Sequence, residues 1–339
     1  MRRKKLLKPI LISLAVIVGF ALLVFGSSRL ESVLAKRPDG AETAPSLSSR
    51  SENASDPIGI VTFEGRDYRP NDNLSVLLII GVDDYGVTET DAGRNTSQSD
   101  FLTLALFDRD ARIVRLVQLN RDTMTDVPVL DGNGELYGMT FQQLALAHTY
   151  GSGLEDSCEN TEFAVSRLLY GVPIDNYFAV TMDVIPILND LVGGVTVTIE
   201  DNFAGVDDSL ALGSTITLTG SQAETYVRAR RGMQDDPTNI ARMRRQRIYM
   251  TGLAEGLSRE AENGDSFVLD AYSAMSDYLV TDCTIDALCE YAEQFSDYTL
   301  EDIVTPEGES VRGEKNMEFY IDEQALQQLV IDLFYVPID

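Results

Sequence analysis

The feature that most constrains the fold is a nine-residue apolar run, Leu74–Val82, with the sequence LSVLLIIGV. A run of this length without polar alternation is typical of a strand that is buried on both faces. Two further strands are expected at Asp100–Phe107 and Ile113–Leu119, with a hairpin between them at 108–112. Because a strand of this kind needs cover on each side, we expect a central sheet between two other layers.

Strand-like and helix-like segments alternate along the rest of the chain. Strands are expected at 177–181 and 195–199, and helices at 141–149, 162–170, 184–191, 221–227, 240–257 and 322–334. This alternation predicts an α/β fold, in which a central mixed β-sheet is flanked by helices on both faces. In such sheets ligands bind beyond the ends of the strands.

The first 28 residues carry the pattern of a membrane anchor. Residues 1–8 hold five cations and no acid, and residues 9–26 contain no charge. Eighteen helical residues rise about 27 Å, which with Leu6 and Leu7 is enough to span a hydrocarbon core of about 30 Å. A cleaved signal peptide is the alternative, although its apolar region is usually only about 7–15 residues long. We expect cytoplasmic residues 1–8 and a retained single-pass transmembrane helix at 9–28, with the main domain outside the cell.

Residues 29–72 are expected to form a disordered extracellular stalk, because they are rich in Ser, Ala, Pro and acids without an apolar period. Residues 73–339 are long enough to form one large domain. Of the three cysteines, Cys283 and Cys289 either bridge or remain free thiols. The only histidine, His148, is expected to be packed or half-exposed and to have no catalytic role.

A second pattern is the concentration of arginine in an acidic chain. The formal charge is −27, yet residues 226–247 (YVRARRGMQDDPTNIARMRRQR) contain seven arginines. Guanidinium groups bind phosphate oxygens bidentately and do not lose their charge. The alternative is a solvated helix face that pairs with nearby Asp and Glu. Together with the upstream residues described next, the block favours a phosphate site, and the acidity of the chain argues against binding of nucleic acid.

Polar residues stand where the predicted strands begin or end. Asp83 follows the first strand, Asp100 opens the second, and Arg121 and Asp122 follow the third. Carboxylates at strand ends suit a hard cation such as Mg²⁺, which takes one or two carboxylates and completes its shell with water and phosphate oxygens. Turn chemistry is the alternative, because Asp also favours strand ends and helix caps.

Seven segments resemble the LytR–CpsA–Psr (LCP) family in order and spacing. They are GVDD at 81–84, SD at 99–100, NRDT at 120–123, YGVPID at 170–175, DLVGGVTV at 190–197, LTGSQAETYVRAR at 218–230 and RMRRQ at 242–246. The resemblance implies a membrane-anchored α/β/α enzyme of Gram-positive cell envelopes. Such an enzyme transfers an anionic glycopolymer, of the teichoic acid or capsule type, from a polyprenyl-pyrophosphate carrier to peptidoglycan, and many members show pyrophosphatase activity.

The resemblance also implies roles for individual residues. Asp83 and Asp100 are expected to hold Mg²⁺ (or Mn²⁺), and Arg121, Asp122, Arg228 and Arg230 are the expected catalytic residues, with Asp122 one candidate to accept the proton of the sugar hydroxyl. The residues expected to bind the pyrophosphate are Arg94, Arg121, Arg228, Arg230, Arg242, Arg245 and Gln246.

The chain departs from the family pattern at several positions. Gln98 stands where the family usually has Arg before Ser-Asp, with Arg94 the nearest substitute, and Gln143 stands in place of a lysine. Tyr85 and Asn239 are further departures. Two alternatives therefore remain open, namely a hydrolase of polyprenyl pyrophosphate and a catalytically silent envelope protein that binds lipid or polymer.

Overall fold

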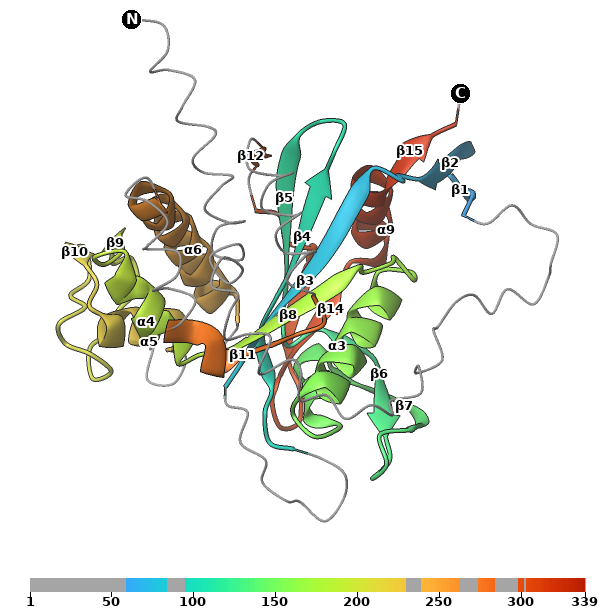
Figure 1. Cartoon of the computed structure of the whole chain (residues 1–339). Helices are drawn as coiled ribbons and strands as arrows, with labels where there is room; N and C mark the ends of the chain where they lie inside the picture. Colours follow the sequence, from blue (N-terminus) through green and yellow to red (C-terminus); the bar gives the residue numbers. More distant parts are fainter. Residues whose placement is uncertain are drawn as a thin grey trace, which may run out of the picture.

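The computed structural model describes residues 59–83, 95–229, 239–261, 274–283, 298–301 and 303–338. At its centre lies a six-stranded sheet with strand order β11-β8-β3-β4-β5-β12 (Figure 1). These strands are β3 (Leu74–Val82), β4 (Ser99–Asp108), β5 (Ile113–Leu119), β8 (Asn176–Thr181), β11 (Leu279–Thr281) and β12 (Thr299–Leu300). The pairs β3–β4, β4–β5 and β8–β11 are antiparallel, whereas β3–β8 and β5–β12 are parallel. The predicted mixed sheet and the hairpin at 108–112 are confirmed.

Helices cover both faces of this sheet. They are α3 (Glu155–Leu168), α4 (Val184–Leu191), α5 (Gly220–Arg228), α6 (Ile240–Ala261) and α9 (Glu323–Phe334), with two short 3-10 helices, η2 (Leu144–Thr149) and η3 (Ser276–Tyr278). Val76, Leu78 and Ile80 of β3 belong to a core that includes residues of α3 and α9, whereas Leu77 belongs to a second core with residues of α4. Figure 1 shows α3 and α9 on one side of the sheet and α4, α5 and α6 on the other. The doubly covered strand that the sequence predicts is therefore confirmed.

Capping residues begin two of the helices that matter for the site. The Thr219 hydroxyl accepts a hydrogen bond from the Gln222 N–H, and the Gln222 side chain accepts one from the Thr219 N–H (2.9 Å), forming a capping box at α5. The Asp322 carboxylate accepts from two N–H groups of the first turn of α9, each at 3.0 Å. The capping box fixes the start of α5, and Arg228 is the last residue of that helix.

The predicted helix at 141–149 is wrong in its first part. Residues 141–143 end strand β7 (Leu136–Gln143), which pairs in antiparallel fashion with β6 (Met124–Leu130), and only residues 144–149 are helical. The reason is tertiary, because Gln143 lies opposite Met124 in the ladder and the Leu144 N–H donates to the Thr123 carbonyl (2.7 Å). Pairing with a distant strand overrides the local apolar spacing.

The domain boundary predicted at residue 73 is also wrong. Strands β1 (Val61–Phe63) and β2 (Arg66–Pro70) form a hairpin, and β2 pairs with the C-terminal strand β15 (Tyr335–Pro337). Strand β2 pairs through its backbone, and its charged sequence RDYRP has no alternation of apolar residues. Apolar patterning could therefore not predict this strand. The predicted anchor and residues 29–58 of the predicted stalk lie outside the described residues. Within the described part, no helix is both long and apolar enough to cross a membrane.

Two further hairpins complete the described structure. One pairs β9 (Thr196–Thr198) with β10 (Thr215–Thr217), and the other pairs β13 (Gly308–Arg312) with β14 (Met317–Ile321). The second touches the central part of the fold through backbone atoms, because the Phe319 N–H donates to the Asp122 carbonyl at 2.9 Å. This contact places β14 beside the turn that follows β5.

We predict that residues 59–72 belong to the cooperative unit of the domain. A chain that begins at residue 73 lacks β1 and β2, and the three residues of β15 lose their partner strand. At about 1 kcal/mol for each lost backbone hydrogen bond, the free energy of unfolding should fall by about 2–3 kcal/mol. The melting temperature should then fall by roughly 5 °C or more. Thermal unfolding of chains that begin at residues 59 and 73 measures this difference, and equal melting temperatures would contradict it.

Candidate active site

Two carboxylates come together at one end of the central sheet. Val82 of β3 pairs with Ser99 of β4, and the register shifts at this point, so that Asp100 is an additional residue of β4. A β-bulge of this kind bends the strand and redirects a side chain, and bulges are common next to active sites. Because Asp83 directly follows Val82, Asp83 and Asp100 each lie one residue from the same cross-strand pair.

Arginines from three different segments contact these carboxylates. Arg228, at the end of α5, lies 3.2 Å from Asp83, and Arg242 of α6 lies 3.1 Å from one oxygen of Asp100. The other oxygen of Asp100 contacts Arg121, which follows β5. The side chain of Arg242 is 4% exposed, whereas those of Arg228 and Asp83 are 39% and 44% exposed. The cluster therefore has a buried end at Asp100 and a solvent-accessible end at Asp83.

Asp122 occupies a buried position behind Arg121. Its side chain is 3% exposed and lies 3.4 Å from the guanidinium of Arg121. Gln143 donates to Asp122 at 2.9 Å and to the Met317 carbonyl at 2.8 Å. Gln143, which stands in place of a lysine, therefore gives Asp122 a neutral hydrogen-bond donor instead of a positive charge. Because an acceptor hydroxyl must reach its base, the burial of Asp122 does not favour it as the proton acceptor, and its described contacts suit a residue that holds Arg121 in place.

Two other departures, Gln98 and Asn239, lie near the cluster, whereas Tyr85 lies outside the described residues. The Gln98 side chain is 3.5 Å from the guanidinium of Arg121, and the Asn239 amide donates to the Asn120 side chain at 2.9 Å. Asn239 directly precedes α6, so this bond ties the start of the helix to the turn that carries Arg121. Both are neutral contacts, and the arginines of the described cluster pair with Asp83, Asp100 and Asp122, while Arg228 also pairs with Glu224 at 2.6 Å.

Arg245 has a different role from the one that the sequence predicts. Its guanidinium donates to the Tyr226 carbonyl (2.7 Å), the Ala229 carbonyl and the Asp201 carboxylate (2.6 Å), and it lies over the ring of Phe203. The side chain is 3% exposed. We therefore correct the prediction that Arg245 binds pyrophosphate, because its donors already hold α6 against the end of α5. Arg94 and Arg230 lie outside the described residues.

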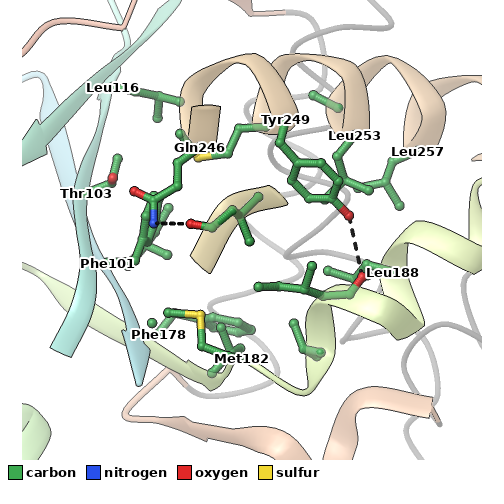
Figure 2. Close-up of a pocket in the computed structure, with 18 of the residues that line it drawn as sticks. Phe101, Thr103, Leu116, Phe178, Met182, Leu188, Gln246, Tyr249, Leu253 and Leu257 are labelled. Carbon is green, nitrogen blue, oxygen red and sulfur yellow. Dashed lines mark hydrogen bonds between the residues drawn. The ribbon is translucent and has the colours of Figure 1, made fainter. Parts of the chain in front are cut away.

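An apolar cavity of about 220 Å³ lies between the sheet and helices α4 and α6. Figure 2 shows its wall, with Phe101 and Phe178 from the sheet facing Tyr249, Leu253 and Leu257 of α6. Gln246 also lines the cavity, and its amide donates to the Val227 carbonyl at 3.4 Å. Gln246 is therefore part of the cavity wall, and no described contact joins it to the aspartates.

The cavity lies beside the arginine–aspartate cluster, although no residue of the cluster lines it. Residues that line it are close chain neighbours of cluster residues: Gly81 precedes Asp83 by two positions, Phe101 follows Asp100, and Val227 precedes Arg228. Sequence reasoning missed this cavity. Two sequence patterns could have indicated it. In β4, Phe101 and Thr103 lie on the face opposite to Leu102 and Leu104. In α6, apolar residues recur at 249, 253 and 257, on one face of the helix.

The donor set fits a hard divalent cation. Asp83 and Asp100 offer carboxylate oxygens, and Mg²⁺ binds through one or two carboxylates when phosphate supplies further ligands. Among the described residues there is no group of three or more side chains that could by itself enclose a metal ion. The described cluster holds three arginines and three aspartates. A pyrophosphate therefore adds unbalanced negative charge, which a cation on the carboxylates would offset.

His148 and two cysteines lie in the interior of the domain. His148 is fully buried, its Nδ1 lies 3.1 Å from the Ser97 carbonyl, and burial lowers its pKa to about 4. Cys158, whose sulfur lies 3.7 Å from His148 Nε2, and Cys283 are both buried free thiols. Burial raises the pKa of both thiols. The expectation of a packed histidine is confirmed, and Cys289 lies outside the described residues.

The fold and site define an α/β/α protein in which an apolar cavity lies beside a cluster of arginine and aspartate. The model of the LytR_cpsA_psr family matches residues 40–333, and the chain belongs to this family. The relative TagU from Bacillus cereus (strain AH820), named a polyisoprenyl-teichoic acid–peptidoglycan teichoic acid transferase, is 29% identical over 256 residues, which cover 75% of this chain and 76% of TagU.

Two solved structures share the fold. TagV from B. subtilis superposes with a TM-score of 0.57 at 20% identity and covers 78% of this chain and 96% of TagV. The protein gbs0355 from Streptococcus agalactiae superposes with a TM-score of 0.59 at 21% identity. The superposition covers 77% of this chain and 87% of the gbs0355 chain. The expected LCP fold, with a central mixed sheet and helices, is therefore confirmed.

We predict that the two kinds of arginine respond differently to substitution. Removing Asp201 leaves buried Arg245 without its carboxylate, so Asp201→Ala should lower the free energy of unfolding by about 3 kcal/mol. Arg228→Ala removes a half-exposed side chain and should cost less than about 1 kcal/mol. Chemical denaturation of both variants measures these values. Equal destabilisation by the two changes would contradict the division into a structural and a ligand-facing arginine.

Proposed function

We propose that the protein is a phosphotransferase that moves an anionic glycopolymer, of the teichoic acid or capsule type, from a polyprenyl-pyrophosphate carrier to peptidoglycan in a Gram-positive envelope. The observation that carries the proposal is that the apolar cavity lies beside the arginine–aspartate cluster, with residues next to Asp100 and Arg228 in its wall. A molecule with a long apolar chain and a phosphate head matches both parts. The name of the relative TagU, which includes a polyisoprenyl-linked polymer and peptidoglycan, supports it.

In the proposed reaction a sugar hydroxyl oxygen of peptidoglycan attacks the phosphorus that carries the polymer. The new P–O bond joins polymer to peptidoglycan as a phosphodiester, and the bond to the bridging oxygen breaks, so that polyprenyl phosphate leaves with the electron pair. Arg121, Arg228 and Arg242 face the place where charge develops on the phosphate oxygens and stabilise it. When bound at Asp83 and Asp100, Mg²⁺ (or Mn²⁺) supplies further positive charge at these oxygens.

The proton of the attacking hydroxyl needs an accessible acceptor. Of the three aspartates in the described cluster, Asp83 has the most exposed side chain (44%), compared with 13% for Asp100 and 3% for Asp122. We therefore expect the proton to leave through the solvent-accessible end of the cluster, where water is within reach. Buried Asp122 holds Arg121 in place and is itself held by Gln143.

The proposal places the domain on the outer side of the cell membrane. Residues 9–28 would anchor the chain as a single-pass helix with the N-terminus in the cytoplasm, as their composition predicts. Peptidoglycan and a polyprenyl carrier meet at that surface, so an anchored domain would have both substrates within reach.

The test of this function uses a polyprenyl-pyrophosphate-linked saccharide as donor, with or without peptidoglycan, in Mg²⁺ or in EDTA. Saccharide transfer and phosphate release are followed separately. Transfer that depends on metal supports the proposal. Release of phosphate with no transfer in the presence of peptidoglycan would indicate a hydrolase, and binding without turnover would indicate a silent binding protein.

We predict that the charges of the cluster are needed for turnover. Asp100→Asn keeps the shape of the side chain but removes the charge that pairs with Arg121 and Arg242, and it should lower kcat/KM at least 100-fold. Arg121→Lys should recover little activity relative to Arg121→Ala, because an ammonium group replaces a bidentate fork. Steady-state kinetics measure both effects, and activity near the wild-type value in Asp100→Asn would exclude the assigned role.

We also predict that the cavity recognises the apolar chain of the donor. Ala254→Phe fills part of the cavity, so KM should rise about 10-fold for a long-chain polyprenyl donor and change little for a donor with a short prenyl chain. Glu255→Phe, on an exposed position of the same helix, is the matched control. Overpacking costs about 1–3 kcal/mol of stability, so thermal unfolding accompanies the kinetics. The same KM change for both donors would contradict this role of the cavity.

A further inference from the structure

A second cleft, of about 690 Å³, lies against the first two turns of α6, beside a different face of the helix from the apolar cavity. Its walls are the first two turns of α6, the segment 305–309 and strand β14. Ile240, Met243 and Arg247 of α6 line it, at helical spacing that places them on one face. Gln246 and Tyr249 line the apolar cavity instead. One helix therefore forms a wall of two separate cavities.

This cleft adjoins the turn that carries the reactive cluster. Asn120 lines the cleft and directly precedes Arg121. The Phe319 N–H of β14 donates to the Asp122 carbonyl at 2.9 Å, and Thr123 forms a backbone bridge with Phe319. The wall of the cleft is therefore hydrogen-bonded to the turn that carries Arg121, so a ligand in the cleft would lie next to this turn.

The charge of the cleft is opposite to that of a phosphate site. Three acids line it, Glu307, Glu309 and Asp322, against the single arginine Arg247. Asp322 is engaged in capping α9, and Arg247 donates to the Thr305 hydroxyl at 3.0 Å. Glu307 and Glu309 are exposed and face a ligand with acceptor oxygens only. This surplus of carboxylate repels an anionic polymer and favours a ligand that is uncharged and rich in hydroxyl donors.

Apolar contacts complete this pattern. Tyr320 lines the cleft with 42% of its surface exposed, and Ile240 with 49% exposed lies on the facing helix. The Tyr320 hydroxyl donates to Glu318 at 2.7 Å, which orients the ring. Exposed rings held in a fixed orientation, together with a few hydrogen-bonding groups, are what a site for a small polar ligand requires.

We propose that this cleft binds the glycan of the acceptor, an uncharged strand of N-acetylhexosamines, and delivers its hydroxyl to the cluster beside Asn120. The proposal rests on the proposed transferase function and adds a location for its second substrate. The donor then binds in the apolar cavity and at the arginines, and the acceptor binds in the carboxylate-lined cleft. Because the carboxylates of the cleft repel anions, an anionic donor polymer is kept out of the acceptor position.

The test compares Tyr320→Ala, Tyr320→Phe and Glu309→Gln with Glu314→Gln in the full-length protein. Glu314 is exposed on the same hairpin but does not line the cleft, so it is the matched control. The probe is a soluble, uncross-linked peptidoglycan oligosaccharide, titrated calorimetrically without donor. Tyr320→Ala and Glu309→Gln should each weaken binding at least 5-fold, whereas Tyr320→Phe keeps the ring and should bind within about 2-fold of wild type, as should Glu314→Gln.

Kinetics separate this inference from the proposed function. In Tyr320→Ala and Glu309→Gln the KM for the acceptor should rise by the same factor as the dissociation constant, while the KM for the donor stays constant. Transfer by the wild type with no dependence of acceptor binding on Tyr320 or Glu309 overturns the location but leaves the transferase function intact. Binding of the oligosaccharide that depends on the cleft, without any transfer, overturns the transferase function and leaves a glycan-binding site.

Discussion

The contact of Asp100 with Arg121 and Arg242 is the interaction on which the rest of the site depends. Arg242 is almost fully buried, and a buried guanidinium without a carboxylate is strongly destabilising. The bulge in β4 brings Asp100 to the sheet end where it meets both arginines. This ion triad fixes α6 against the strand ends, and α6 in turn forms a wall of the apolar cavity and of the carboxylate-lined cleft.

The arginine block that dominates the sequence serves two purposes. Arg244 and Arg245 bind Asp201 in the segment after β9, as the alternative of acid-paired arginines proposes, and Arg245 also holds α6 to the end of α5. Arg228 and Arg242 face Asp83 and Asp100, in agreement with the expectation of a charged site. Both interpretations therefore apply, but to different residues of one block. The structural pairs hold the helices in place, so the ligand-facing arginines need little rearrangement to meet a phosphate.

Much of the fold could be predicted because burial leaves a strong local pattern. β3 is apolar at every position but one, and its bounds agree with the prediction. The helix at 184–191 is likewise confirmed. Segments whose structure depends on distant partners were missed, since β2 needs β15 and residues 141–143 need β6. In the site, Arg242 and Arg245 lie three residues apart on one helix, and only their tertiary surroundings separate a residue of the cluster from a structural one. The bulge at Asp100 and the cavity each form where two or more elements meet, so the pattern of one strand alone could not predict them.

The arrangement of β13 and β14 has a consequence for how this protein can diverge. The hairpin forms one wall of the carboxylate-lined cleft. It contacts the turn that carries Arg121 only through backbone atoms and the amide of Gln143 among the described contacts. Its outward side chains can therefore be exchanged without disturbing the ion triad or the apolar cavity. By contrast, positions 246 and 247 are adjacent on α6 and serve different cavities, so changes there affect both. Variation between lineages with different cell walls should concentrate in the hairpin, while the helix stays nearly constant.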